Sequence, residues 1–188
     1  MKIINKTIFS ENQVFNFYFS HLIDDDGREV KKYFILEPKN IKKDRTAGVA
    51  ILPVINEEIG LINIFRPAID SYSWEIPHGF IDKHESDREA AARELREETS
   101  LKTGNNNLTS LGYVFPDTGI MSARVHLFSV EVGHITNEKL SELGIQKFSF
   151  FNLKEIKKMI EHSEISDSYT LVSILKFLNL KKKINWNL

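Results

Sequence analysis

A helix of mixed charge that follows a single glycine constrains this chain more than any other feature. After Gly79, Ser86 and Glu89 form a capping box, which marks the first turn of a helix. The residues that follow are mostly Ala, Leu, Glu and Arg, which are good helix formers. We therefore predict a helix that begins at Ser86 and ends near Thr99. Its apolar stripe, expected to pack on the core, comprises Ala91, Ala92, Leu95 and Thr99.

Three glutamates of this helix share one face. Glu94, Glu97 and Glu98 are three and four positions apart, so their carboxylates lie close together and repel one another. Arg93, four positions before Glu97, offsets only about 0.2–0.5 kcal/mol of that repulsion. An acidic run on a helix is usually a solvated surface. The alternative is a site for a hard divalent cation, because such ions prefer carboxylate oxygens.

The stretch from Gly79 to Leu101 resembles the Nudix box, the signature of hydrolases that split nucleoside diphosphates linked to another moiety. Gly79, Glu85 and the run from Arg93 to Glu98 occupy its fixed positions, whereas Ser100 stands where the signature has a glycine. This resemblance favours metal binding over a solvated face. Ser100 either adopts a left-handed conformation, at a cost of about 1 kcal/mol, or the helix continues to Gly104.

The resemblance implies a cofactor and its ligands. Glu94 and Glu98 would bind Mg²⁺, with Mn²⁺ as the alternative ion, together with the backbone carbonyl of His78. Glu97 would lie near the metal or hold a water molecule. The glycine at position 79 then lets the backbone approach the metal.

Two further residues of the box are better interpreted as orienting than as catalytic. Glu85 and Arg93 would position the loop and the glutamates. The imidazole of His78 could also be a general base, but its carbonyl is the group that the resemblance implicates.

Features outside the box are similar to the ADP-ribose pyrophosphatase branch. Arg66 follows an aromatic residue as in that branch, where the arginine contacts a substrate phosphate, although a surface arginine is an equal alternative. Trp74 lies in a Trp-Glu-Ile-Pro stretch similar to the branch's Trp-Glu-Leu-Pro, and could stack on a base or pack in the core. Pro116 lies 15 residues after Leu101, where proteins acting on ADP-ribose carry a proline.

The catalytic base is predicted in a loop. The segment from Gly133 to Gly144 has a glycine at each end and polar residues between, as a mobile loop over a site would. Glu138 and Glu142 are its acidic residues. If neither is the base, Glu97 or a metal-bound hydroxide must take the role.

The order of the predicted elements indicates an α+β fold. The resemblance sharpens this to an α/β/α sandwich around a mixed β-sheet, formed by residues 45–188. Residues 1–44 are predicted to be an antiparallel β unit, in which Phe15, Phe17 and Phe19 alternate along one strand and the segment from Val30 to Leu36 returns. A short unit could not bury these rings alone, so it is expected to help form a homodimer.

Composition narrows the function classes. The 188 residues include no cysteine, which excludes disulfides and thiolate catalysis and suits the cytoplasm. The net charge of −1 gives no footprint for nucleic acid, and the longest apolar run is too short to span a membrane.

We expect Mg²⁺-dependent hydrolysis of ADP-ribose, or of a related nucleoside diphosphate sugar such as GDP-mannose, to a nucleoside monophosphate and a sugar phosphate. The alternative is a Nudix-fold module that senses a small-molecule nucleotide without cleaving it.

Overall fold

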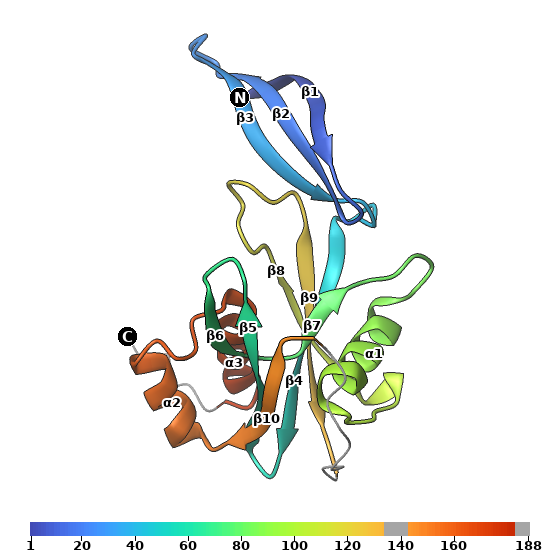
Figure 1. The fold of residues 1–188 in the computed structure, drawn as a ribbon, viewed down its shortest axis with the longest axis vertical. Helices are drawn as coiled ribbons and strands as arrows, with labels where there is room; N and C mark the ends of the chain where they lie inside the picture. The colour runs from blue at the N-terminus through green and yellow to red at the C-terminus, as the bar shows by residue number, and fades with distance from the viewer. Residues whose placement is uncertain (134–142, 183–188) are drawn as a thin grey trace. The chain divides into compact units, whose positions relative to one another are not determined.

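The chain divides into two units in the computed structural model, which describes residues 1–133 and 143–182 (Figure 1). One unit contains Met1–Ala47 together with Phe115–Arg124, and the other contains Gly48–Val114 and the chain from Val125 onward. Residues 115–124 therefore join the N-terminal part of the chain in space. Whether residues 1–44 and 45–188 are separate domains, as the sequence suggested, stays a prediction.

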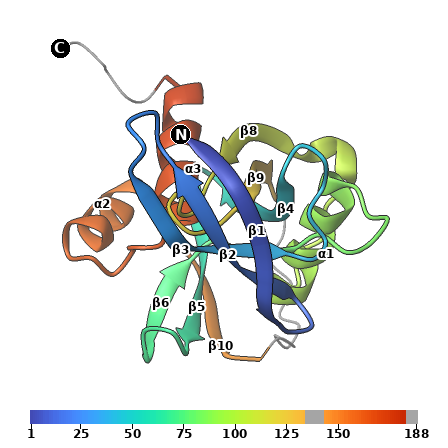
Figure 2. The same cartoon turned by 90° about the horizontal axis from the view of Figure 1, so that it is seen from above.

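The N-terminal unit is an antiparallel sheet of three strands, in the order β1-β2-β3 (Figure 2). Its strands are β1 (Lys2–Glu11), β2 (Phe15–Ile23) and β3 (Glu29–Pro38). The β2–β3 hairpin confirms the predicted β unit, whereas β1 was not foreseen, because all its residues are exposed and it lacks a buried alternation. Phe9 of β1 stacks on Phe19 of β2 with the ring centroids 4.1 Å apart.

The second unit is built on one sheet with the strand order β10-β5-β4-β9-β8. A backbone hydrogen bond joins Val132 N to Val54 O, and one in the N-terminal unit joins Arg124 N to Arg45 O, so β4 and β9 run parallel. The other pairs are antiparallel, which makes the sheet mixed, as predicted. Two short strands complete it, since β6 pairs with β5 and β7 with β4. The strands are β4 (Thr46–Ile55), β5 (Glu58–Arg66), β6 (Ser71–Glu75), β7 (His78–Phe80), β8 (Thr109–Val114), β9 (Arg124–Glu131) and β10 (Ile145–Phe151).

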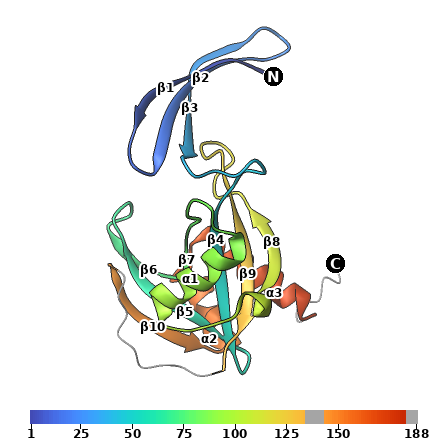
Figure 3. The same ribbon diagram turned by 90° about the vertical axis from the view of Figure 1, so that its right-hand side faces the viewer.

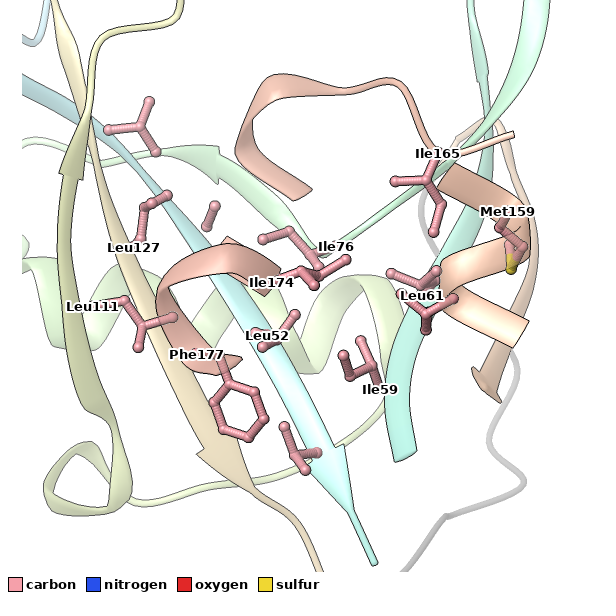
Figure 4. Close-up of a cluster of buried hydrophobic side chains, with 14 residues drawn as sticks. Leu52, Ile59, Leu61, Ile76, Leu111, Leu127, Met159, Ile165, Ile174 and Phe177 are labelled. Carbon is pink, nitrogen blue, oxygen red and sulfur yellow. The ribbon is translucent and has the colours of Figure 1, made fainter. Parts of the chain in front are cut away.

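Helices cover both faces of this sheet. Val49 and Ile51 of β4 pack in the cluster that contains α1 (Asp87–Thr99), which lies in front of the sheet in Figure 3. Ala50 and Leu52 point the other way, into the cluster formed with α2 (Leu153–Glu161) and α3 (Ser168–Leu180) (Figure 4). This alternation confirms the α/β/α sandwich, because successive strand residues face opposite sides. A short 3₁₀ turn, Asn105–Asn107, follows α1.

Helix α1 begins and ends as its sequence indicates. The Ser86 side chain accepts from the Glu89 amide and Glu89 caps the Ser86 amide in return. The helix ends at Thr99, and Ser100 takes the left-handed conformation with φ of 62°, so the extension to Gly104 does not occur.

The buried face of α1 differs from the predicted stripe in one residue. Ala90 is fully buried, whereas Ala92 is only half-buried. The reason is that the buried arc also includes Glu94 and Glu98, which rotates the face that meets the sheet away from Ala92. Among the described residues, none of the helices is long and apolar enough to cross a membrane.

Candidate active site

Two glutamates of α1 are buried against the strand that precedes the helix. Glu94 is 6 % exposed and Glu98 is 2 % exposed, although carboxylates are seldom buried without compensation. A Cβ added to Gly79 of β7 would overlap the Glu94 carboxylate. Gly79 is in turn close to β4, because a Cβ on Gly48 would lie 2.9 Å from the Gly79 carbonyl oxygen. The glycine is therefore required for the carboxylate to reach the backbone.

Arg93 joins the loop before α1 to its acidic face. Its Nε and Nη2 donate to Glu85, at 3.0 Å and 2.9 Å, and Nη2 also donates to the Phe80 carbonyl. Its Nη1 donates to Glu94 at 2.7 Å and to Glu97 at 3.1 Å. The hydrogen bonds to Glu85, followed by those to Glu94 and Glu97, raise the pKa of Arg93 although burial opposes this. These contacts agree with the orienting role expected of Glu85 and Arg93.

The three glutamates of the acidic face do not have equal environments. Glu98 Oε2 accepts from the His78 amide at 2.9 Å, which ties α1 to β7 a second time. Glu97 is 41 % exposed in its side chain and pairs with both Arg93 and Arg96. The structure thus places Glu94 and Glu98 inside the site and Glu97 at its edge.

The donors at this position suit a hard cation. Within residues 1–133 and 143–182, no three His, Asp or Glu side chains converge as a metal-binding group. Glu94 and Glu98 supply two buried carboxylates, and the carboxylate of Glu94 lies against the backbone at Gly79. Two carboxylates with a backbone carbonyl form an all-oxygen donor set, which Mg²⁺ prefers.

Arg66 lies beside these residues and is held by two side chains. Its Nε and Nη2 donate to the buried Glu75, the shortest of these bonds being 2.6 Å, and Nη2 also reaches His78 Nε2 at 2.8 Å. Burial would lower the pKa of Arg66, but its hydrogen bonds and attraction to Glu75 outweigh this and raise it. Glu75 belongs to the Trp-Glu-Ile-Pro stretch, but the sequence indicated no role for it. Its place on β6, directly across the hairpin from the strand of Arg66, was the signal that could have identified it.

The remaining predicted residues are less closely associated. Trp74 packs edge-on against Phe151 with ring centroids 4.9 Å apart and borders a core cluster, which fits the alternative of a core aromatic. Pro116 belongs to the segment that joins the N-terminal unit, whereas Arg66 and Trp74 belong to the other unit. Glu138 and Glu142 lie outside the described residues.

The family model described as "NUDIX domain" matches residues 44–170. The chain belongs to the Nudix hydrolase family. The match spans the glutamate helix and most of the mixed sheet, so the family recognised in the Gly79–Leu101 stretch is confirmed.

Three relatives among known proteins are similar to this chain, and two of them are named as pyrophosphatases of ADP-sugars or ADP-ribose. An ADP-sugar pyrophosphatase of Mus musculus is 27% identical over 135 residues, which are 69% of this chain and 61% of that protein. An ADP-ribose pyrophosphatase of Saccharomyces cerevisiae is 34% identical over 91 residues, covering 45% of this chain and 38% of that protein. A methanol dehydrogenase activator of Bacillus methanolicus is 26% identical over 190 residues and covers 95% of both chains. The chain thus spans about three fifths of the mouse protein.

A solved structure supports the Nudix fold. A crystal structure of an ADP compounds hydrolase superposes with a TM-score of 0.77, at 18% identity, over 97% of this chain and 96% of that chain. At this identity the likeness establishes the fold alone.

Proposed function

We propose that this protein hydrolyses the pyrophosphate bond of ADP-ribose or a related nucleoside diphosphate sugar, to a nucleoside monophosphate and a sugar phosphate. The observation that carries the proposal is the pair of buried carboxylates, Glu94 and Glu98, held against the glycine strand β7. Burying two carboxylates is unfavourable unless hydrogen bonds or cations compensate for it. Arg93 does so for Glu94 and the His78 amide for Glu98, and a divalent cation bound to both would add to this. The relatives named as ADP-sugar and ADP-ribose pyrophosphatases support this choice of substrate.

Glu94, Glu98 and the carbonyl of His78 are the groups that would hold Mg²⁺, or Mn²⁺ in its place. When bound, such an ion neutralises charge on the phosphate oxygens and lowers the pKa of bound water. Arg93 keeps both ends of this arrangement fixed, because it bonds Glu85 on the loop and Glu94 on the helix.

The predicted site residues other than the metal ligands would bind the substrate and orient the attacking water. Arg66 would bind a phosphate through the edge of its guanidinium that Glu75 does not occupy, since its side chain is 33 % exposed. Trp74 and Pro116 are proposed to border the rest of the substrate. Glu138 or Glu142 would orient the attacking water, and Glu97, half-exposed on α1, is the substitute for them.

A direct assay tests this function. The protein incubated with ADP-ribose and Mg²⁺ should release AMP, and a panel of sugar nucleotides should rank the substrates. Glu98→Gln keeps the shape but removes a charge, so kcat should fall by about 10²–10⁴-fold while circular dichroism stays unchanged. Glu161→Gln, on the exposed surface of α2, is the matched control and should be fully active. Near-normal turnover of Glu98→Gln at saturating Mg²⁺ would show that the ligand assignment is wrong.

A second candidate is a nucleotide-sensing module without hydrolytic activity. The observation in its favour is that the relative matched over 95% of both chains is named as an activator of methanol dehydrogenase. The same assay separates the two functions. Saturable binding of a sugar nucleotide, with no product at any Mg²⁺ or Mn²⁺ concentration, would favour sensing.

We further propose that the protein is a homodimer and acts in the cytoplasm. The apolar side chains of β1 are unusually exposed, with Ile4 at 53 % and both Ile8 and Phe9 at 50 %. A second copy of the chain would cover them. The absence of cysteine from the 188 residues suits a reducing compartment.

A further inference from the structure

The imidazole of His78 makes contacts that the box glutamates do not explain. Its Nδ1 lies 2.9 Å from the Ile76 carbonyl oxygen, and its Nε2 lies 2.8 Å from Arg66 Nη2. A carbonyl only accepts and a guanidinium only donates. The ring must therefore donate from Nδ1 and accept at Nε2, which defines one neutral tautomer.

This tautomer completes the arrangement around Arg66. Glu75 takes the Nε edge of the guanidinium, and His78 shares Nη2 with it. A guanidinium that is hydrogen-bonded on two sides has little rotational freedom. The direction in which its remaining nitrogen, Nη1, points is therefore fixed. The Arg66 side chain is one-third exposed, so an anion from solvent can approach it.

The ring of His78 is itself held in place by packing. Tyr169 at the start of α3 meets it edge-on, with centroids 5.0 Å apart and planes at 65°. Burial, with the nearby charge of Asp167, raises the pKa of Tyr169 to about 12, so this neighbour stays neutral. The side chain of His78 is only 16 % exposed. It is therefore a half-buried, oriented acceptor rather than a surface histidine.

We propose that the His78 side chain is a positioning residue, which holds the Arg66 guanidinium so that its free edge faces the diphosphate of the substrate. The same residue donates its backbone N–H to Glu98 at 2.9 Å. His78 thus connects the guanidinium that binds the substrate phosphate with a carboxylate of the metal site. This inference rests on the proposed function for its kinetic consequence, but the tautomer can be observed without any substrate.

The first test is the tautomer. Long-range ¹H–¹⁵N correlation spectra of the protein at pH 7.5, assigned with the His78→Gln variant, should show Nδ1 protonated and Nε2 unprotonated. In Arg66→Ala the Nε2 resonance should shift, because its donor is gone. A protonated Nε2 in the wild-type protein would overturn the proposal even if hydrolysis is observed.

The second test separates positioning from a structural role. His78→Ala and His78→Asn both lack an acceptor at the ε position, so KM should rise about tenfold with kcat within about threefold of wild type. His78→Gln places an amide oxygen near that position and should restore KM to within about threefold. His162→Ala, an exposed histidine at the end of α2, is the matched control.

A double-mutant cycle completes the experiment. If His78 acts through Arg66, His78→Ala should change KM by less than about twofold in an Arg66→Ala background. A full tenfold effect in that background would overturn the proposal. If the wild-type protein hydrolyses no sugar nucleotide, the proposed function fails, and the cycle is then measured on the Kd for ADP-ribose.

Discussion

At the scale of single residues, the site depends on how closely Glu94 approaches the backbone of β7. Position 79 has no room for a side chain, because the carboxylate occupies the space of a Cβ. Ser100 shows the opposite case, since a residue with a side chain is accommodated where the family signature has a glycine, at φ of 62°. A side chain at position 79 would displace the Glu94 carboxylate. The side chain at position 100 costs only backbone strain.

Gly79→Ala should therefore abolish most activity without unfolding the protein. The added methyl group must push Glu94 away, so we expect kcat to fall by at least about a hundredfold, as for loss of an essential electrostatic group. Gly104→Ala is the control, because its nearest neighbour would be Asn107 Nδ2 at 3.9 Å. Steady-state kinetics of both variants tests this prediction. Equal activity of the Gly79→Ala and Gly104→Ala variants would contradict the close packing of Glu94 against position 79.

Ser100→Gly should stabilise the protein without changing its activity. Glycine adopts the left-handed conformation freely, so the free energy of unfolding should rise by about 1 kcal/mol. Urea unfolding followed by fluorescence would measure the change. A decrease in stability would mean that the contacts of the buried Ser100 side chain outweigh the strain.

At the scale of elements, a chain of side-chain hydrogen bonds fastens the start of α1 to the sheet. His126 on β9 bonds Asp87 of α1 at 2.7 Å and Ser110 of β8 at 2.8 Å. Its ring lies between Tyr113 and Phe128, with centroids 4.2 Å and 4.1 Å away. Since α1 carries Glu94 and Glu98, this link contributes to the position of the site.

The same three residue types form hydrolytic triads, in which serine attacks a carbonyl. Here the Ser110 oxygen also accepts from the Gly112 amide at 3.2 Å, at the point where the register between β8 and β9 shifts. The arrangement is therefore a structural link.

His126→Ala should weaken the attachment of α1. It removes two hydrogen bonds and an aromatic stack, so the free energy of unfolding should fall by about 2–3 kcal/mol. Ser110→Ala removes two hydrogen bonds, to His126 and to the Gly112 amide, but both are exposed, so it should cost less than about 1 kcal/mol. Chemical denaturation of both variants measures the difference. Equal, small losses would show that the link carries no stability.

At the scale of the whole molecule, the N-terminal sheet exposes the apolar side chains of its strand β1, among them Ile4, Ile8 and Phe9. Phenylalanines from all three strands form one cluster, in which the rings of Phe17 and Phe34 lie 6.4 Å apart. Exposed apolar side chains gathered on one strand are typical of a protein–protein contact. This is the physical reason to expect a second copy of the chain on β1.

The dimer can be tested by placing a charge on that strand. Sedimentation of the wild-type protein at micromolar concentration should give the mass of two chains, and Ile8→Glu should shift it toward one, because a buried charge at an interface is costly. Leu175→Glu, an equally exposed leucine on α3, should leave the mass unchanged. A wild-type monomer would refute the proposal.

The sequence by itself determined the features that depend on neighbouring positions. The capping box of α1 and the spacing of the box glutamates both follow from local geometry. These signals repeat with the period of a helix or a strand, so they can be recognised in the amino-acid sequence alone. They also sufficed to recognise the Nudix family.

Only the tertiary structure decided which side chains meet across the sheet. The β5–β6 hairpin brings Glu75 to Arg66, and the β4–β7 pairing places His78 between Arg66 and α1. Likewise, residues 115–124 join the N-terminal unit because the Leu36 amide bonds the Ile120 carbonyl, far away in the chain. Such contacts depend on which strands pair and in which register, and a shift of a single residue would turn every side chain of a strand to the other face of the sheet.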